Sequence, residues 1–280
     1  MNLTQFDYQK SNNFNIKLIK TGKKYNLFRI EFPSAYRVGI PVCDKVTACY
    51  YRSANPKKAI IIIHGISMVW ATSYFCRILA KKGFSCLMPI MPYAPARIPR
   101  KRPLTKIPEN MNWPEIFKRG LIQSVIDVRK SIDFLEKEND MIGIIGISLG
   151  ANIAALVKSI DDRIISGVFL VGGADLANTL WDSRDFIARI YKQKLFRCID
   201  RQELALKWKQ IDVLTYAKES SNILMINAKY DTSVRPIYTI KLWEALGKPE
   251  IHWLRCAHFF IIHIFFIKNL VLRHFRKTLN

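Results

Sequence analysis

The residues with the clearest chemical potential lie in a five-residue pattern, Gly146-Ile147-Ser148-Leu149-Gly150. An apolar run precedes the pattern and small helix-forming residues follow it, which predicts a sharp turn from a strand into a helix. Such a turn strains the backbone of Ser148 and exposes its hydroxyl, while glycine on both sides lets strand and helix approach closely. The N–H groups at the helix start can stabilise negative charge. Ser148 is therefore a candidate nucleophile.

Such a turn needs a strand and a helix to hold it, and the pattern of apolar residues predicts a strand over 141–147 and a helix over 149–159. Elsewhere too, strands alternate with helical segments of about ten or more residues, which is typical of right-handed crossovers and a mostly parallel sheet. Further strands are expected over 25–32, 45–52, 59–63, 85–90, 164–171, 223–228 and 250–254, and further helices over 69–82, 114–138, 237–246 and 259–273.

The chain of 280 residues is 50% hydrophobic and carries no Gly/Ser linker, so we expect one α/β domain over 1–280. The first two strands are separated by turn residues and predict an antiparallel edge, and 178–219 predicts a helical cap insertion. Ligands of parallel sheets bind at the carboxyl ends of the strands. The residues that follow each strand are thus the functional candidates.

With its strand-turn-helix context, the pattern around Ser148 resembles that of the α/β-hydrolase superfamily, specifically its serine esterases and lipase-like members, over about residues 45–273. The resemblance implies the chain order nucleophile, acid, histidine, with an oxyanion loop after an earlier strand. It also implies acyl transfer through a covalent intermediate on Ser148, with an ester, thioester or amide as substrate. We expect no metal or organic cofactor.

The resemblance places the oxyanion loop at His64-Gly65-Ile66-Ser67, after the buried strand 59–63. It implies that the backbone N–H of Ile66 pairs with that of Leu149 to hold the oxyanion of a tetrahedral intermediate. His64 precedes the nucleophile and is out of order for a base, so we expect it to shape this loop. Gly65 is expected to support this loop, and Gly146 and Gly150 are expected to support the turn at Ser148.

Two aspartates are candidates for the acid. Asp231 follows the strand 223–228, in a turn that leads through Pro236 into the next helix, and matches the position that the family uses. Asp175 follows the preceding strand, where some members take the acid, and its alternative role is an Asx turn or helix cap. We favour Asp231 and keep Asp175 as the alternative.

The base is expected at His258, directly after the strand 250–254 and before the last helix. The residue before it is Ala257, where the family usually has glycine. His263 falls within the last predicted helix and is expected to be packed or on the surface. His252 and His274 do not fit the position.

Two segments are candidates for substrate binding. The loop after the strand 85–90 holds four cations that could steer an anionic substrate, and the insertion holds apolar residues that could wall an acyl chain. The alternatives are that the loop cations are simply solvated and that the apolar residues of the insertion pack in the core. The residues concerned are Arg97, Arg100, Lys101 and Arg102 in the loop, and Leu180, Trp181 and Phe186 in the insertion.

The charge balance is strongly basic, with 44 Lys and Arg against 22 Asp and Glu, a net charge of +22. Such a positive charge would suit an anionic acyl carrier or an acidic membrane surface as partner. A membrane surface would be contacted through Arg273, Arg276 and Lys277 near the end of the sequence. The alternative is that the charge reflects compositional drift and has no partner. No basic recognition helix is evident, so we expect no specific nucleic-acid partner. A non-catalytic binding protein with the same fold is a further alternative.

The six cysteines stand singly, which predicts free thiols in a reducing compartment. The start of the chain lacks the basic and apolar runs of a signal peptide, and no apolar stretch approaches the roughly 20 residues of a spanning helix. We therefore expect a cytoplasmic protein, at most peripheral at a membrane. The pattern does not indicate an oligomeric state.

Overall fold

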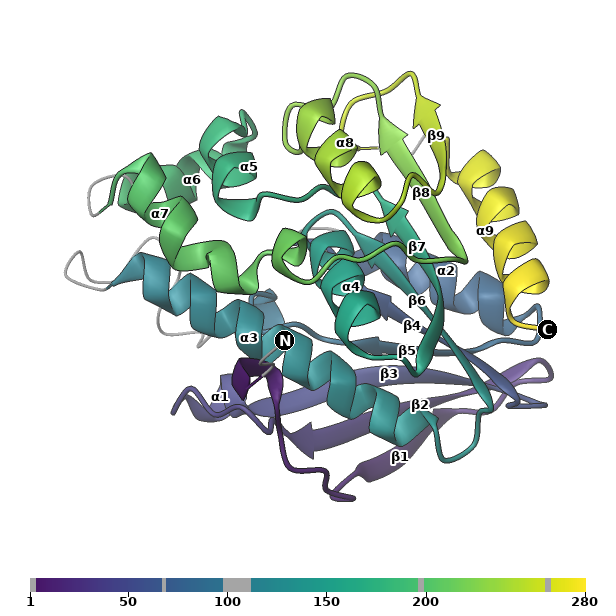
Figure 1. The fold of residues 1–280 in the computed structure, drawn as a ribbon. Coiled ribbons are helices and arrows are strands. Elements are labelled where there is room, and N and C mark those ends of the chain that lie inside the picture. The colour runs from purple at the N-terminus through teal and green to yellow at the C-terminus, as the bar shows by residue number, and fades with distance from the viewer. Residues whose placement is uncertain (1–3, 67–68, 98–111, 196–198, 260–262) are drawn as a thin grey trace.

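The computed structural model describes residues 4–66, 69–97, 112–195, 199–259 and 263–280 (Figure 1). The strands are β1 (Asn15–Lys20), β2 (Tyr25–Pro33), β3 (Lys45–Ser53), β4 (Lys58–Ile63), β5 (Ser85–Pro89), β6 (Met141–Ile147), β7 (Ile164–Leu170), β8 (Ile223–Ala228) and β9 (Glu250–Leu254). The helices are α1 (Pro41–Asp44), α2 (Val69–Ala80), α3 (Trp113–Leu135), α4 (Leu149–Ile160), α5 (Leu176–Asp182), α6 (Phe186–Leu195), α7 (Arg201–Trp208), α8 (Pro236–Ala245) and α9 (Ile264–Thr278).

The strands form a nine-stranded sheet in the order β1-β2-β3-β5-β4-β6-β7-β8-β9. The pairs from β5–β4 through β8–β9 are parallel, whereas β1–β2, β2–β3 and β3–β5 are antiparallel. The expected α/β architecture, a mostly parallel sheet with an antiparallel N-terminal edge, is confirmed. Parallel pairing aligns the carboxyl ends of the central strands along one edge of the sheet.

The apolar side chains of the sheet divide between two cores, one on each face. In β4, Ala59, Ile61 and Ile63 pack with α3, α4 and α8, and Ile60 and Ile62 pack with α2 and α9 on the other face. All five side chains are fully buried. Figure 1 shows α3 and α4 on one face of the sheet and α2 on the other. Burial on both faces explains why this strand is an unbroken apolar run.

Two elements depart from the expectations. Strand β1 was not expected; all six of its residues are exposed, so no buried face imposes the alternation by which a strand is recognised. The last helix, α9, begins at Ile264 and not at residue 259, and its buried residues include Ile267, Val271 and Phe275. The apolar run 259–267 predicted an earlier start, whereas Phe259 lies in the loop after β9.

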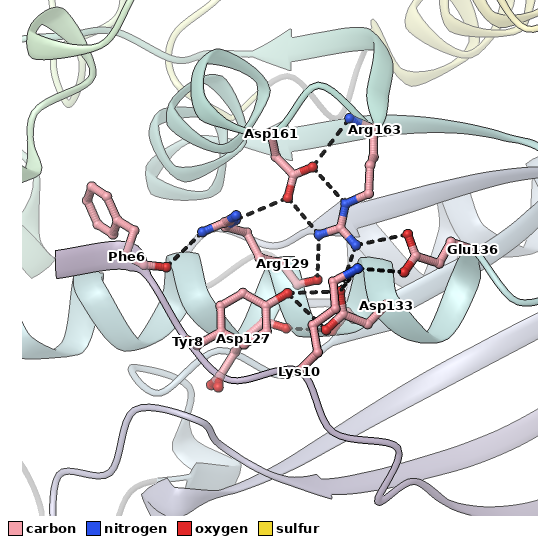
Figure 2. A network of polar contacts seen from close by, with 10 residues as sticks. Phe6, Tyr8, Lys10, Asp127, Arg129, Asp133, Glu136, Asp161 and Arg163 are labelled. Atoms are coloured by element: carbon pink, nitrogen blue, oxygen red, sulfur yellow. Dashed lines mark hydrogen bonds and ion pairs between the residues drawn. The ribbon is translucent and has the colours of Figure 1, made fainter. Parts of the chain in front are cut away.

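A polar network ties the start of the chain to α3 and to the turn between α4 and β7 (Figure 2). The Arg163 guanidinium donates to Asp161 at 2.8 Å and to Asp133 at 2.6 Å. Tyr8 also donates to Asp133, at 2.9 Å, and Arg129 donates to Asp161 at 3.0 Å. Burial alone would raise the pKa of the Asp161 carboxyl, but the hydrogen bonds from Arg163 and Arg129 outweigh it and lower that pKa. The network is structural and lies away from the carboxyl ends of the strands.

The segment expected as a cap insertion, 178–219, lies between β7 and β8 and contains most of α5, then α6 and α7, followed by the 3-10 turns Lys209–Ile211 and Val213–Thr215. These helices stand beside α3 on the side of the carboxyl ends of the strands (Figure 1). No described helix is long and apolar enough to cross a membrane. The five cysteines within the described residues are free thiols.

Candidate active site

Ser148 stands at the turn between β6 and α4 with φ of 57° and ψ of −121°, a left-handed conformation that strains a residue with a side chain. A Cβ atom at Gly146 would fall on the backbone of Gly150 and Ala151, and one at Gly150 would fall on the backbone of Ile63 and His64. Both glycines are therefore required by the close approach of strand, turn and helix. The turn lies where the pattern predicted it.

The structure brings Ser148, His258 and Asp231 together. The Nε2 atom of His258 lies 2.9 Å from the Oγ of Ser148, and its Nδ1 lies 2.7 Å from Oδ2 of Asp231. The backbone N–H groups of Ser233 and Val234 both donate to Oδ1 of Asp231 at 2.8 Å. Asp231 is 5% exposed and His258 is 8% exposed, so the bond between these two residues is shielded from water, while Ser148 is partly exposed.

The pairing of β8 with β9 brings the acid and the histidine together. It continues past the strand ends, because Lys229 N–H donates to Leu254 O at 2.8 Å and Tyr230 N–H donates to Cys256 O at 3.0 Å. The turn that carries Asp231 is thereby held against the loop that carries His258. Ser233 and Val234, which orient Asp231, were not singled out from the sequence, since backbone donors leave no signature in residue type.

His64 lies beneath the loop after β4 and is fully buried. Its Nδ1 lies 2.8 Å from Gly65 O, and its Nε2 accepts from the N–H of Met91 at 3.0 Å. Since Nε2 accepts, Nδ1 carries the proton and donates. Burial lowers the pKa of the imidazole, against the opposing effect of the Gly65 bond, so the ring is neutral near pH 7. His64 thus contacts the loop and not Ser148.

The alternative acid, Asp175, lies in a different environment. It has φ of 57° at the start of α5, its Oδ2 forms an ion pair with Lys241 at 2.5 Å, and its Oδ1 accepts from Asn178 at 2.8 Å. The other histidines are also elsewhere: His252 bonds to Glu250, His274 contacts Ser166, and His263 stands just before α9. Asp175 is therefore not part of the hydrogen-bonded chain.

A cavity of about 190 Å³ opens beside Ser148 and His258. The oxyanion candidates Ile66 and Leu149 line it, and the insertion contributes Leu180 and Phe186, as expected of an apolar wall. Side chains not singled out from the sequence complete the lining: Phe117 of α3, Asn152 of α4, Leu176 and Thr179 of α5, Ser183, Asp185, Ala188, and Ser233, Val234 and Phe259 from the loops. No group of three or more metal-ligating side chains is assembled within the described ranges.

Trp181 was expected to contact substrate. Trp181 does not line the cavity; it is half-buried and packs against the core that contains α3 and α4. Its neighbour Leu180 lines the cavity instead. Adjacent residues of a helix point about 100° apart, so a window of apolar residues does not reveal which of them faces the site.

The expectation that Arg97 steers an anionic substrate is wrong. Its side chain is 2% exposed and forms an ion pair with Asp127 of α3 at 2.8 Å. It also donates to Ile90 O at 2.8 Å and to Cys43 O. Arg97 therefore fastens the loop after β5 to the underlying helix. The other three cations of that loop, Arg100, Lys101 and Arg102, lie outside the described residues.

The Arg97 contacts predict a large effect on stability. Arg97→Met should lower the free energy of unfolding by about 3–5 kcal/mol, because it leaves the buried Asp127 carboxylate without its cation. Burial already raises the pKa of Asp127, and the charge of Arg97 opposes that rise. Urea unfolding would measure the loss. The double variant Arg97→Met/Asp127→Leu should recover much of it; a loss below about 1 kcal/mol in the single variant would contradict this role.

Comparison with solved structures identifies the fold. An acetyl xylan esterase from a Paenibacillus species superposes with a TM-score of 0.78 at 14% identity, covering 96% of this chain and 90% of that one. The acylaminoacyl peptidase of Pyrococcus horikoshii gives a TM-score of 0.69 at 15% identity, covering 91% of this chain and 42% of that one. These enzymes are α/β-hydrolases. The chain therefore has the α/β-hydrolase fold.

Comparison by sequence reaches two uncharacterized proteins from strains of Mycobacterium tuberculosis. Each is 27% identical over 225 residues, which cover 75% of this chain and 52% of the relative. The chain spans about half the length of the curated relatives it matches. No family model matches the chain.

Proposed function

We propose that the protein is a serine hydrolase that cleaves a carboxylic ester or thioester through an acyl-enzyme. The observation that carries this proposal is the continuous hydrogen-bonded chain from Ser148 Oγ through His258 to Asp231, at 2.9 and 2.7 Å. These hydrogen-bonded residues lie beside an apolar cavity, and the protein shares its fold with esterases. Ser148 is the nucleophile, His258 the general base and Asp231 the residue that orients His258.

The proton path follows from the contacts of His258. With Nδ1–H donating to Asp231, the lone pair of Nε2 faces the Ser148 hydroxyl and takes its proton as Oγ attacks the carbonyl carbon. The proton then passes from Nε2 to the leaving alcohol or thiol, and the acyl group remains on Ser148. A water molecule, deprotonated by the same nitrogen, then attacks the acyl carbon, and Nε2 returns the proton to Ser148 Oγ as the acid leaves. Asp231 stabilises the imidazolium that forms in each half of the reaction.

The oxyanion would be held by the N–H groups of Ile66 and Leu149. Leu149 is the first residue of α4, and the first N–H groups of a helix have no partner within the helix. In the Gly65–Ile66 peptide, C=O and N–H point in opposite directions, so the bond from His64 Nδ1 to Gly65 O turns the Ile66 N–H away from His64. A Cβ at Gly65 would lie 3.1 Å from the Cβ of Ser148, so this loop lies close enough to the nucleophile to hold an oxyanion.

This role for His64 predicts a difference between two substitutions. His64→Leu should lower kcat by about 10- to 100-fold with little change in KM, because the Gly65–Ile66 peptide loses the bond that orients it and removal of one oxyanion donor typically costs 100-fold or more. His64→Asn should retain more activity, since its amide Nδ2 can occupy the place of Nδ1. Steady-state kinetics at one pH would compare them. Equal losses in both variants, with unchanged melting temperatures, would contradict the role.

The size and the apolar lining of the cavity favour a substrate whose short apolar acyl group binds there. Leu180, Phe186, Leu176 and Phe117 offer apolar surface, and burial of each methylene of an acyl chain is worth about 0.8 kcal/mol. A neutral acyl ester is therefore the substrate class to test first.

The test combines a covalent probe with a substrate series. A fluorophosphonate probe should label the wild-type protein and should not label Ser148→Ala, which distinguishes an enzyme from a binding protein with this fold. With p-nitrophenyl esters of increasing acyl length, kcat/KM should rise while methylenes fit the cavity and then fall. Absence of labelling in a folded wild-type protein would refute the proposed function.

A second candidate is the same hydrolase acting at an acidic membrane surface. Phe259, which lines the cavity, is 57% exposed, and Phe265 and Phe266 at the start of α9 are 69% and 49% exposed. Exposed aromatic residues together with the cations of α9 are typical of interfacial binding. Phe265→Ser/Phe266→Ser should reduce co-sedimentation with anionic vesicles, whereas Leu206→Ser, at an equally exposed residue of α7, should not.

Lipid binding by the cations near the end of α9, Arg273, Arg276 and Lys277, is better tested by charge reversal than by truncation. Phe275 and Leu279 are fully buried in the core that contains α9, so removing the end of the helix would open that core. Arg276→Glu/Lys277→Glu leaves the core intact and should weaken vesicle binding if those cations contact lipid. We also propose, as another role for the positive net charge, that it attracts an acyl substrate attached to an anionic carrier. The salt dependence of kcat/KM with charged and neutral substrates would test this role.

A further inference from the structure

The sheet ends in an open edge at β1. Within the described residues β1 pairs with β2 alone, and all six of its residues are exposed. Ile16, Leu18 and Ile19 are each at least half exposed, at 53%, 51% and 50%. Figure 1 shows β1 at the far end of the sheet from β9, away from the insertion. An exposed edge with apolar side chains offers backbone groups and contacts to another strand.

The register of β1 on β2 separates its side chains into two faces. Ile16 and Leu18 pair with Ile30 and Phe28, so they share the face whose β2 side chains join the core of α3. Lys17 pairs with Arg29 on the opposite face. The strand is therefore apolar on one face and cationic on the other.

A bulge at Ile19 strengthens this division. The register shifts between Leu18 and Lys20, so Lys20 pairs with Leu27 and falls on the same face as Lys17 and Arg29. Without the bulge, Lys20 would share a face with Leu18. Two lysines of β1 thus lie on one face beside an arginine of β2.

Positive charge predominates around this edge, where Glu31, opposite Asn15, is paired with Lys45. Between Asp7 and Glu31 the sequence has six cations, Lys10, Lys17, Lys20, Lys23, Lys24 and Arg29, and no acidic residue. Lys17, Lys20, Lys23 and Lys24 are exposed and form no ion pair with any described residue. Lys17 and Arg29 stand directly opposite each other, and like charges in that position repel. A carboxylate placed beside them would relieve the repulsion.

We propose that the edge of β1 binds an extended segment of another protein in which acidic and apolar side chains alternate. Backbone hydrogen bonds to β1 extend the sheet by one strand, the apolar side chains cover Ile16 and Leu18, and the acidic side chains face Lys17 and Lys20. A second copy of this chain is the less suited occupant. It would place two sets of these lysines along one seam between molecules of net charge +22.

A groove of about 890 Å³ continues the edge at the Asn15 end of β1. It is lined by Asn13, Phe14 and Asn15 before and at the start of the strand, and across it by Arg37, by Asp44 and by Glu31 and Lys45, which form an ion pair at 2.8 Å. The groove gives a segment longer than β1 room to continue past the strand, where amide groups and both charges meet it, so the preference for acidic side chains rests on Lys17 and Lys20 of β1. The binding surface consists of β1 and this groove.

Binding to the full chain can be measured by fluorescence anisotropy with a capped, labelled peptide of alternating valine and glutamate, about eight residues long. We expect saturable binding that weakens with added salt. Lys17→Glu/Lys20→Glu should weaken it by at least about tenfold, since two attractive contacts become repulsive. Lys81→Glu/Lys82→Glu, which changes the net charge equally on exposed lysines beyond α2, should leave affinity within about twofold.

Two matched peptides separate a strand from mere charge attraction. A peptide with the same valines and glutamates in two blocks, and one with backbone N-methylation on every second residue, should each bind at least about tenfold more weakly. Equal binding by either would overturn the proposal, as would equal effects of the two lysine pairs. A wild-type dimer in sedimentation that Leu18→Lys dissolves would assign the edge to a second copy and would also overturn it.

Discussion

Ser148→Ala should lower kcat for an activated ester by about a million-fold, the size of effect that loss of the nucleophile has in a comparable serine hydrolase. The reason is local. The only side-chain hydrogen bond recorded for Ser148 in the described structure is with His258 Nε2, so the substitution removes the attacking atom and little else. Stopped assays at high enzyme concentration, with active-site titration, would measure the residual rate.

The fold should tolerate this change. Alanine has the same Cβ as serine, so the strained turn at φ of 57° costs the same with either residue. The melting temperature should therefore stay within about 2 °C, since the change in free energy is a fraction of a kcal/mol. Ser233→Ala is a matched control, because Ser233 contributes its backbone N–H to Asp231 and retains it in the variant. Activity of Ser148→Ala above a tenth of wild type would end the assignment of Ser148 as nucleophile.

Much of the site could be predicted because its requirements are local and appear in residue type. Gly146 and Gly150 are needed since any side chain there would collide with backbone, and this need produces a recognisable spacing around Ser148. The ends of buried strands are likewise readable, because burial on both faces selects apolar runs such as the one in β4. Residues that directly follow such runs are therefore placed at the carboxyl edge with little ambiguity.

The errors arose where the role of a side chain depends on its direction. Arg97 occurs in a basic loop, and only the three-dimensional structure reveals that its guanidinium turns inward to Asp127, 30 positions along the chain. Trp181 and Leu180 are neighbours in one helix and differ only in which way they point. Strand β1 has no buried face, so hydrophobic periodicity carried no signal for it.

The choice between Asp231 and Asp175 leads to the second large effect. Asp231→Asn should lower kcat by about 10,000-fold, the loss found for the matched change in a serine protease. Here the geometry explains the direction. The N–H groups of Ser233 and Val234 both donate to Oδ1, so the asparagine carbonyl takes that place and its NH₂ group faces His258. His258 Nδ1 must then accept, which moves the ring proton to Nε2 and leaves no lone pair to deprotonate Ser148.

Asp175→Asn is the matched control for Asp231→Asn. Asp175 follows β7 and Asp231 follows the neighbouring strand β8, and each substitution replaces one carboxylate oxygen with an NH₂ group. Asp175→Asn should reduce kcat by less than about threefold, since it loses an ion pair with a partly exposed Lys241 and leaves His258 untouched. Kinetics of both variants under one set of conditions would rank them. The reverse ranking would move the acid to the end of β7, and similar small losses in both would mean that His258 is oriented without a carboxylate. The 2.7 Å contact between Asp231 and His258, and the ion pair that occupies Asp175, favour a large loss for Asp231 alone.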